Sequence, residues 1–496
     1  MIAKTLPTPR PDGAAEVRES VALETARRLG TNSAVLLASQ VFNTLVAGIM
    51  GLLLIRYLGR AQYGLFASLY AFLYVFQILS SLGIDTIVFR DVARAPQDAA
   101  RTASRALGLR LVLIGFSMLA SWVAAAFLAP SAAYFWWVVI ISTTFLFSFY
   151  PYYLLIYDVE LRQGLPKLAM AAFTLAFSGA KLALIVLHAP LSAFVVLEPL
   201  SAVATLALAW FLARRMGLGL RPTFEPLHWA RLLRETWPAA VAIGFINLYY
   251  RVDQLMLLRL SGPEQVGLYG ASVRVVELAN VIPVTFVASA FPLLARFAVE
   301  SQEHLERATQ LAFRAMAWAG FPLAAWLFLY AETVIRILFD AEFAPAAGLL
   351  RLLAISLPAG FVGSVLFNRL LSTSQQMSAA MLAASVAAVN VSLNVIWIPR
   401  WQAEGAALAT AVSYCAVPIL ALALPAARGL GWQAISSMLR PALGIAAAAF
   451  LVHVLGVGAL AGFFVLAVSY GGAMLLLREW TSTEARVLRH ACGRTP

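Results

Sequence analysis

Long uninterrupted runs of apolar residues dominate the chain, and only short polar stretches separate them. A helix needs about 20 mostly apolar residues to cross a membrane, and fourteen runs reach that length. The widest gaps between runs, 214–235 and 295–310, hold no soluble domain. We therefore predict an all-α integral membrane protein with about 14 transmembrane helices, over residues 33–57, 65–89, 106–128, 134–156, 168–188, 191–213, 236–260, 267–294, 311–331, 346–370, 378–398, 405–427, 437–456 and 458–477.

The composition supports a membrane location and gives an orientation. Apolar side chains make up 61% of the 496 residues and charged ones 12%, against about 45–50% and about 25% in soluble domains. This balance excludes an ordinary soluble enzyme. Most of the 36 Lys and Arg residues fall in alternate loops on one side of the predicted spans. The positive-inside rule makes that side cytoplasmic. We expect both termini to be cytoplasmic, in a bacterial inner membrane, with no nucleic-acid partner.

An internal repeat divides the chain into two lobes. Leu53–Phe66 matches Met256–Tyr269 at an offset of 203 residues (256 − 53), with Arg, Gly, Gln, Gly and Leu at corresponding positions. Each segment joins two predicted spans, so the repeat unit is six helices and its two copies have the same orientation, as in parallel-repeat transporters. The expected parts are a cytoplasmic tail (1–32), an N-lobe (33–213), a cytoplasmic linker (214–235), a C-lobe (236–427), two further helices (437–477) and a second cytoplasmic tail (478–496), with a cavity between the lobes. Residues 14–29 fit either an amphipathic helix on the lipid surface or a solvated tail.

Ionisable residues inside membrane spans are costly and are functional candidates. Asn247, Arg251 and Gln254 share one helical face, which we expect to line the cavity, with the Arg251 guanidinium binding a phosphate oxygen. The alternative is that such residues form ion pairs between helices. Arg251 with Glu277, or Arg274 with Asp253, are the expected pairs.

Further candidates lie in the N-lobe. Lys181 falls near the middle of its span, where we expect it to line the cavity. Tyr70, Tyr74, Gln77, Ser81 and Asp85 form one stripe on a helix. Tyrosine rings with hydroxyl groups suit sugars, which present apolar faces rimmed by hydroxyls. A buried seam between helices explains the same stripe.

No pattern for catalysis or for a metal site is present. The five His residues are scattered, Cys415 and Cys492 are far apart, and no nucleotide-binding or hydrolase motif occurs. We expect no enzyme activity, no catalytic residue, no metal and no cofactor. Coupling to a proton or sodium gradient is possible in principle, and the intramembrane acids available for it are Asp253, Glu277, Asp85 and Glu198.

Several segments resemble the polysaccharide-flippase branch of the multidrug/oligosaccharidyl-lipid/polysaccharide (MOP) exporter superfamily. They are Ile55–Ser68, Ser81–Arg94, Asp253–Glu277, Ala288–Arg296 and Leu393–Tyr414, and the similarity extends from about residue 30 to 425. The resemblance implies two lobes that alternate in access. It also implies that the protein exports a polyprenyl-pyrophosphate-linked oligosaccharide to the outer leaflet. Glycan polymerases or glycosyltransferases are the partners that the resemblance implies. Asp253 matches a recurring acid of this family, whereas the helices at 437–477 diverge within it and carry no functional inference.

Other functions share this architecture. A multidrug exporter of the same superfamily would need a more acidic cavity, and a lipid II flippase would have the same overall design. A membrane glycan polymerase or ligase would need catalytic residues presented outside the membrane, but the longest predicted outer loop, 331–345, is short.

Overall fold

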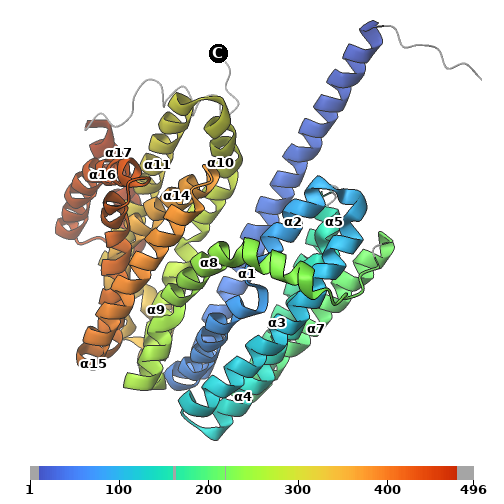
Figure 1. Ribbon diagram of the computed structural model, residues 1–496. Helices are drawn as coiled ribbons and strands as arrows, with labels where there is room; N and C mark the ends of the chain where they lie inside the picture. The colour runs from blue at the N-terminus through green and yellow to red at the C-terminus, as the bar shows by residue number, and fades with distance from the viewer. Residues whose placement is uncertain (1–10, 160–163, 218, 477–496) are drawn as a thin grey trace, which may run out of the picture.

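The computed structural model describes residues 11–159, 164–217 and 219–476, and within these ranges every regular element is a helix. The N-terminal bundle contains α1 (Pro11–Ser81), α2 (Ile84–Arg94), η1 (Pro96–Asp98), α3 (Ala99–Leu128), α4 (Ala132–Ser142), η2 (Thr143–Phe147), α5 (Tyr150–Val159), α6 (Gly164–Val186) and α7 (Leu191–Arg215). Helix α1 begins at Pro11, so residues 14–29 are helical and continue into the first predicted span. Its N-terminal part extends beyond the other helices (Figure 1).

Helix α8 (Pro226–Ser261) connects this bundle to a second one and packs on both (Figure 1). The second bundle contains α9 (Pro263–Ala279), α10 (Val281–Glu300), α11 (Gln302–Leu329), α12 (Ala331–Leu338), η3 (Ala341–Phe343), α13 (Ala346–Ile355), α14 (Leu357–Ser372) and α15 (Gln376–Ala423). Helices α16 (Arg428–Leu455) and α17 (Ala459–Leu476) pack on its outside against α11. The all-α membrane fold is confirmed.

The number of spans is a separate question. In the described part of the chain, ten helical segments are long and apolar enough to cross a membrane, or up to eleven if the bent pair α13–α14 is one span. Two of them, Val41–Ser81 and Gln376–Ala423, each cover two of the predicted spans and are interrupted by non-helical backbone at Gly59 and Gln402. Helix α8, which carries several charged residues, is not among the ten. The count of fourteen stays a prediction.

Several predicted spans are broken inside the membrane region. The run 65–89 changes from α1 to α2 at Leu82 and Gly83, both with left-handed backbone (φ 43° and 72°). The run 134–156 changes from α-helix to a 3-10 helix over Thr143–Phe147 before α5 begins. The run 346–370 bends by 45° between α13 and α14, at Ser356. A break leaves backbone groups unpaired, and within a membrane these need partners from neighbouring helices.

The apolar cores follow the two bundles. Two buried clusters, centred on Phe194 and Ile84, belong to the N-terminal bundle. The largest cluster, centred on Phe361, belongs to the C-terminal bundle and also takes in Ile55 of α1. A fourth joins α16 and α17 to α11. Each bundle therefore has its own packed interior, and Ile55 of α1 ties the N-terminal bundle to the C-terminal core.

The internal repeat is visible as matched backbone geometry. Gly59 has φ 68° and ψ 172°, and Gly262, its repeat equivalent, has φ 86° and ψ 173°. Positive φ of this kind strongly favours glycine. One turn further, a Cβ on Gly64 would overlap the backbone carbonyl of Pro263, and a Cβ on Gly267 would overlap that of Arg60. Since residues 60 and 263 also correspond in the repeat, the two hairpins contact each other reciprocally, as a pseudo-twofold axis requires.

Candidate functional site

The larger cavity lies within the N-terminal bundle and has a volume of about 910 Å³. Among the described side chains, its lining comes from residues between Ser39 and Thr205, all in the N-terminal bundle. The cavity between the lobes stays a prediction. Five of the predicted site residues line it, namely Tyr70, Tyr74, Gln77, Asp85 and Glu198. Tyr70, Tyr74 and Gln77 of α1 therefore border a cavity together with Asp85. The stripe was predicted on one helix, whereas the break at Leu82 and Gly83 places Asp85 on α2.

Lys181 lies next to this cavity and is already paired. Its Nζ on α6 is 2.8 Å from Glu198 Oε1 on α7. Both side chains are largely buried, at 28% and 15% exposure. Glu198 borders the cavity, whereas Lys181 stands behind it. Lys181, which was predicted to line the cavity, therefore forms an ion pair with Glu198, which does line it.

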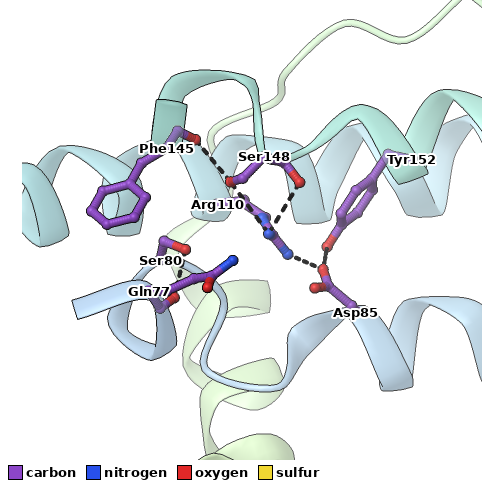
Figure 2. A network of polar contacts seen from close by, with 7 residues as sticks. All are labelled: Gln77, Ser80, Asp85, Arg110, Phe145, Ser148 and Tyr152. Carbon is purple, nitrogen blue, oxygen red and sulfur yellow. Dashed lines mark hydrogen bonds and ion pairs between the residues drawn. The ribbon is translucent and has the colours of Figure 1, made fainter. Parts of the chain in front are cut away.

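Asp85 at one end of the cavity is held by groups that the sequence did not indicate. Arg110 on α3 forms a close ion pair with Asp85 Oδ1, and the Tyr152 hydroxyl on α5 donates to the same oxygen at 2.8 Å. The Arg110 guanidinium also lies 3.4 Å from the carbonyl oxygen of Ser148 and 3.5 Å from its Oγ. Figure 2 shows Arg110 between Ser148 and Asp85, with Tyr152 beside the carboxylate. Arg110 thereby links the α1–α2 break to the η2–α5 break.

A second cavity, of about 290 Å³, lies mainly in the C-terminal bundle. Arg251, Asp253, Gln254 and Glu277 line it, and Tyr74 lines both cavities. The Arg251 guanidinium carbon is 5.6 Å from the centre of the Tyr74 ring. The two cavities therefore adjoin at Tyr74, and Arg251 stands at that junction. The side chain of Asn247 lies outside the described residues.

Arg251 and Arg274 share one carboxylate. Arg251 is 3.1 Å from Glu277 Oε1, and Arg274 is 3.1 Å from Glu277 Oε2. Arg274 also donates to the carbonyl of Ala47 on α1, across the boundary between the bundles. The expected Arg251–Glu277 pair is present. Arg274 pairs with Glu277 and not with Asp253.

Asp253 is almost completely buried, at 4% exposure, and its carboxylate is held by polar groups without a direct cation. The Tyr269 hydroxyl donates to Oδ2, and the backbone N–H of Gln254 donates to Oδ1 at 2.7 Å. The Thr410 hydroxyl on α15 lies 3.4 Å from Oδ2. These donors connect α8, α9 and α15 around one buried acid, which can bind a proton or a small cation. Among the described residues, no group of three or more His, Cys, Asp and Glu side chains is arranged to hold a metal ion.

At the predicted outer ends, ion pairs join the two bundles. Arg56 Nε is 3.0 Å from Asp340 Oδ1, and Arg60 is 3.1 Å from Glu264. The backbone N–H of Arg60 donates to Glu342 at 3.2 Å. Together with the Gly64–Gly267 approach, these contacts close this end of the molecule.

Comparisons with known proteins agree with this architecture. A family model described as polysaccharide biosynthesis protein matches residues 29–298, and one described as MatE matches residues 238–396. None of the curated proteins matches the chain.

Solved structures show the same fold at low sequence identity. The lipid II flippase MurJ in an inward closed conformation superposes with a TM-score of 0.72 at 14% identity, covering 90% of this chain and 99% of that one. An inward-facing multidrug resistance MATE transporter of the MOP superfamily gives 0.58 at 13%, covering 81% and 95%. Its outward-facing counterpart gives 0.56 at 15%, covering 82% and 96%.

The similarity therefore has two independent parts. The fold is that of MOP-superfamily flippases and transporters, and the first family model covers more than half of the chain. The chain belongs to the polysaccharide biosynthesis protein family, within the MOP exporter superfamily.

Proposed function

We propose that the protein flips a polyprenyl-pyrophosphate-linked oligosaccharide from the cytoplasmic to the outer leaflet of a bacterial inner membrane. The observation that carries this proposal is the cavity of about 910 Å³ bordered by tyrosine, glutamine, hydroxyl and charged side chains within a membrane bundle. Ligand cavities commonly measure about 300–1,000 Å³, so this one suits a head group of several sugars. The polyprenyl chain stays in the lipid. The solved structures with this fold are a flippase and transporters, and the proposed function likewise includes no chemical step.

Arg251 is the proposed contact for the pyrophosphate. It stands where the two cavities adjoin, and its side chain is 30% exposed. A guanidinium binds two phosphate oxygens through parallel donors. Gln254, Tyr70, Tyr74 and Gln77, which line the two cavities, complete the proposed substrate site. Arg274 supports it through the Glu277 carboxylate that it shares with Arg251, and Lys181 supports it through Glu198. Asn247 is included from its helical spacing to Arg251 alone.

The transport cycle follows from the boundary between the bundles. The ion pairs at Arg56 and Arg60 hold the outer end closed, so the described state receives substrate from the cytoplasmic side. Separation of the two bundles at that end releases it outside. Asp253 is the proposed proton or sodium site, because it joins three helices and lies beside the Arg251 cavity. The glycosyltransferases and polymerase of the same polysaccharide are the expected partners.

The test is the position of lipid-linked glycan in cells. An Arg251→Ala variant should accumulate lipid-linked glycan in the inner leaflet, measured by whether an impermeant glycosidase can reach it in spheroplasts. The matched control is Arg259→Ala, which removes an exposed arginine from the same helix and should export normally. Normal export in the Arg251 variant removes the pyrophosphate assignment. Normal export after deletion of the whole gene removes the proposed function.

A further inference from the structure

The carboxylate of Asp85 is presented to the N-lobe cavity in a fixed orientation. Its side chain is 49% exposed, whereas the side chain of its partner Arg110 is 6% exposed. Both residues line the cavity, but the acid exposes much more of its side chain than the cation does. A substrate that enters the cavity therefore meets mainly the carboxylate of this pair.

Two neighbours bind the same oxygen of that carboxylate. Arg110 and the Tyr152 hydroxyl both contact Oδ1, and no group in the described ranges is recorded against Oδ2. Ser148 holds the guanidinium from its other side (Figure 2). Carboxylate rotation is restricted because one oxygen has two donors on different helices. Oδ2 is left as a pre-oriented acceptor, and such preorganisation lowers the entropic cost of binding.

The cavity around Asp85 has the surface of a carbohydrate site. Aromatic rings of Tyr74, Tyr150, Phe145 and Phe173 line it, and so do the hydroxyl-bearing side chains of Thr144, Ser148, Thr174, Ser201 and Thr205. Sugars offer apolar faces to aromatic rings and hydroxyl donors to acceptors. A carboxylate oxygen accepts hydroxyl hydrogen bonds that are about twice as strong as neutral ones.

The charge at this end of the cavity favours an uncharged sugar. The other acid that lines the cavity, Glu198, is paired with Lys181, and Lys167 also lines the cavity. At Asp85 the paired Arg110 lines the cavity too but is almost fully buried, so an acidic sugar beside this pair meets mainly the carboxylate. Like charges at close range oppose binding. A sugar with neighbouring hydroxyls and no acid group meets no such penalty.

We propose that Asp85 accepts hydrogen bonds from neighbouring hydroxyls of an uncharged sugar in the glycan head group, with Arg110 and Tyr152 as positioning residues. This inference rests on the proposed function and names the class of sugar that this end of the cavity binds. It assigns Asp85 to substrate recognition, whereas the sequence placed it among the acids available for ion coupling.

The experiment measures binding of defined probes to the full chain in lipid nanodiscs. One probe is polyprenyl pyrophosphate without sugar, the second carries a glucose trisaccharide, and the third carries the same trisaccharide ending in glucuronate. The probes carry three sugars because the head group has to reach from Tyr74, next to the proposed pyrophosphate contact Arg251, to Asp85. The helical stretch from Tyr74 to Ser81 alone spans about 10 Å, and Asp85 lies beyond it. The wild type should bind the neutral trisaccharide probe more tightly than either of the others.

Asp85→Asn should remove most of the advantage of the neutral trisaccharide, about ten- to a hundredfold in Kd, since a hydrogen bond to a charged group is lost. Binding of the sugar-free probe should not change. Because Asp85→Asn leaves Arg110 without its acid, Tyr152→Phe provides a milder variant that keeps the ion pair. It should lower the affinity for the neutral trisaccharide severalfold and leave the sugar-free probe unaffected. Asp98→Asn, at an exposed acid outside the cavity, is the control and should change neither.

The outcomes separate the two levels of the proposal. If the wild type does not bind the sugar-free probe, the proposed function fails and this inference fails with it. If that probe binds, and both the Asp85 and Tyr152 variants keep the full advantage of the neutral trisaccharide, the role of Asp85 is refuted while the proposed function stands. If the glucuronate probe binds as tightly as the neutral one, the preference for an uncharged sugar is refuted.

Discussion

Replacing Gly64 by alanine should force the outer end of the molecule apart. The added Cβ would overlap the backbone carbonyl of Pro263 in the other bundle and approach Gly267. The neighbours are backbone atoms, so no side chain can rotate away to make room. Overpacking of this kind costs about 1–3 kcal/mol. Since about 1.4 kcal/mol changes an equilibrium tenfold, the closed outer end should lose roughly five- to 150-fold in population relative to open states.

The exposed ion pairs at the same end should matter less than this glycine contact. The Arg56–Asp340 pair is 57% and 50% exposed, and such pairs contribute about 0.2–1 kcal/mol. Arg56→Ala should therefore change the equilibrium at most severalfold. Steric approach of the two repeat hairpins, more than surface charge, sets the closed state.

The assay is a distance measurement between spin labels at Ala133 and Ala344, exposed positions near the outer ends of the two bundles, in a chain with Cys415 and Cys492 changed to serine. Gly64→Ala should add a longer distance to the distribution. Gly115→Ala, where an added Cβ meets nothing within 4 Å, is the control and should leave the distribution unchanged. A folded Gly64 variant with the parent distribution would refute the reasoning.

Three further predictions test other parts of the structure. Lys181→Met should lower the free energy of unfolding by about 1–3 kcal/mol, because Glu198 is left partly buried without a partner. Adding Glu198→Gln should restore the Tm in detergent, and no recovery would contradict this pairing. Asp253→Asn should abolish the dependence of reconstituted flipping on an imposed proton or sodium gradient, and retained dependence would place coupling elsewhere. Gln402→Gly should raise the Tm, because Gln402 has φ 49°, a conformation costly for a side chain by about 1–3 kcal/mol; an unchanged or lower Tm would argue against strain there.

The sequence predicted the membrane fold and the repeat because both follow from periodic, additive signals. Apolar runs report spans directly, and the matched glycines at 59 and 262 mark turns that require positive φ. Prolines within the apolar runs, such as Pro151 and Pro358, predicted bends, and breaks lie near both. The break between α1 and α2 was not predicted. Gly83 is a residue type that favours positive φ, but Leu82 takes left-handed backbone as well, which a leucine does not indicate.

The site was predicted in part. Tyr70, Tyr74 and Gln77 line a cavity from one face of α1, as their helical spacing suggested, and Asp85 joins them from α2, beyond the break. Arg110 was missed because it was counted with the cytoplasmic arginines, although it falls near the start of the predicted span 106–128. In the structure α3 begins earlier, at Ala99, which brings Arg110 inside the bundle against Asp85. The Lys181–Glu198 pair joins two helices whose relative rotation is set by packing, and sequence spacing says nothing about that rotation.

These pairings decide which cation is able to receive a pyrophosphate. Lys181 and Glu198 form a one-to-one pair, so a phosphate that captured Lys181 would leave a carboxylate at 15% exposure without its cation. Leaving such a carboxylate without its partner costs about 1–3 kcal/mol. Glu277 is instead shared between Arg251 and Arg274. When a phosphate takes Arg251, Glu277 keeps Arg274 at 3.1 Å, so no buried acid is left unpaired. The shared carboxylate makes Arg251, rather than Lys181, the cation that is available to an entering anion.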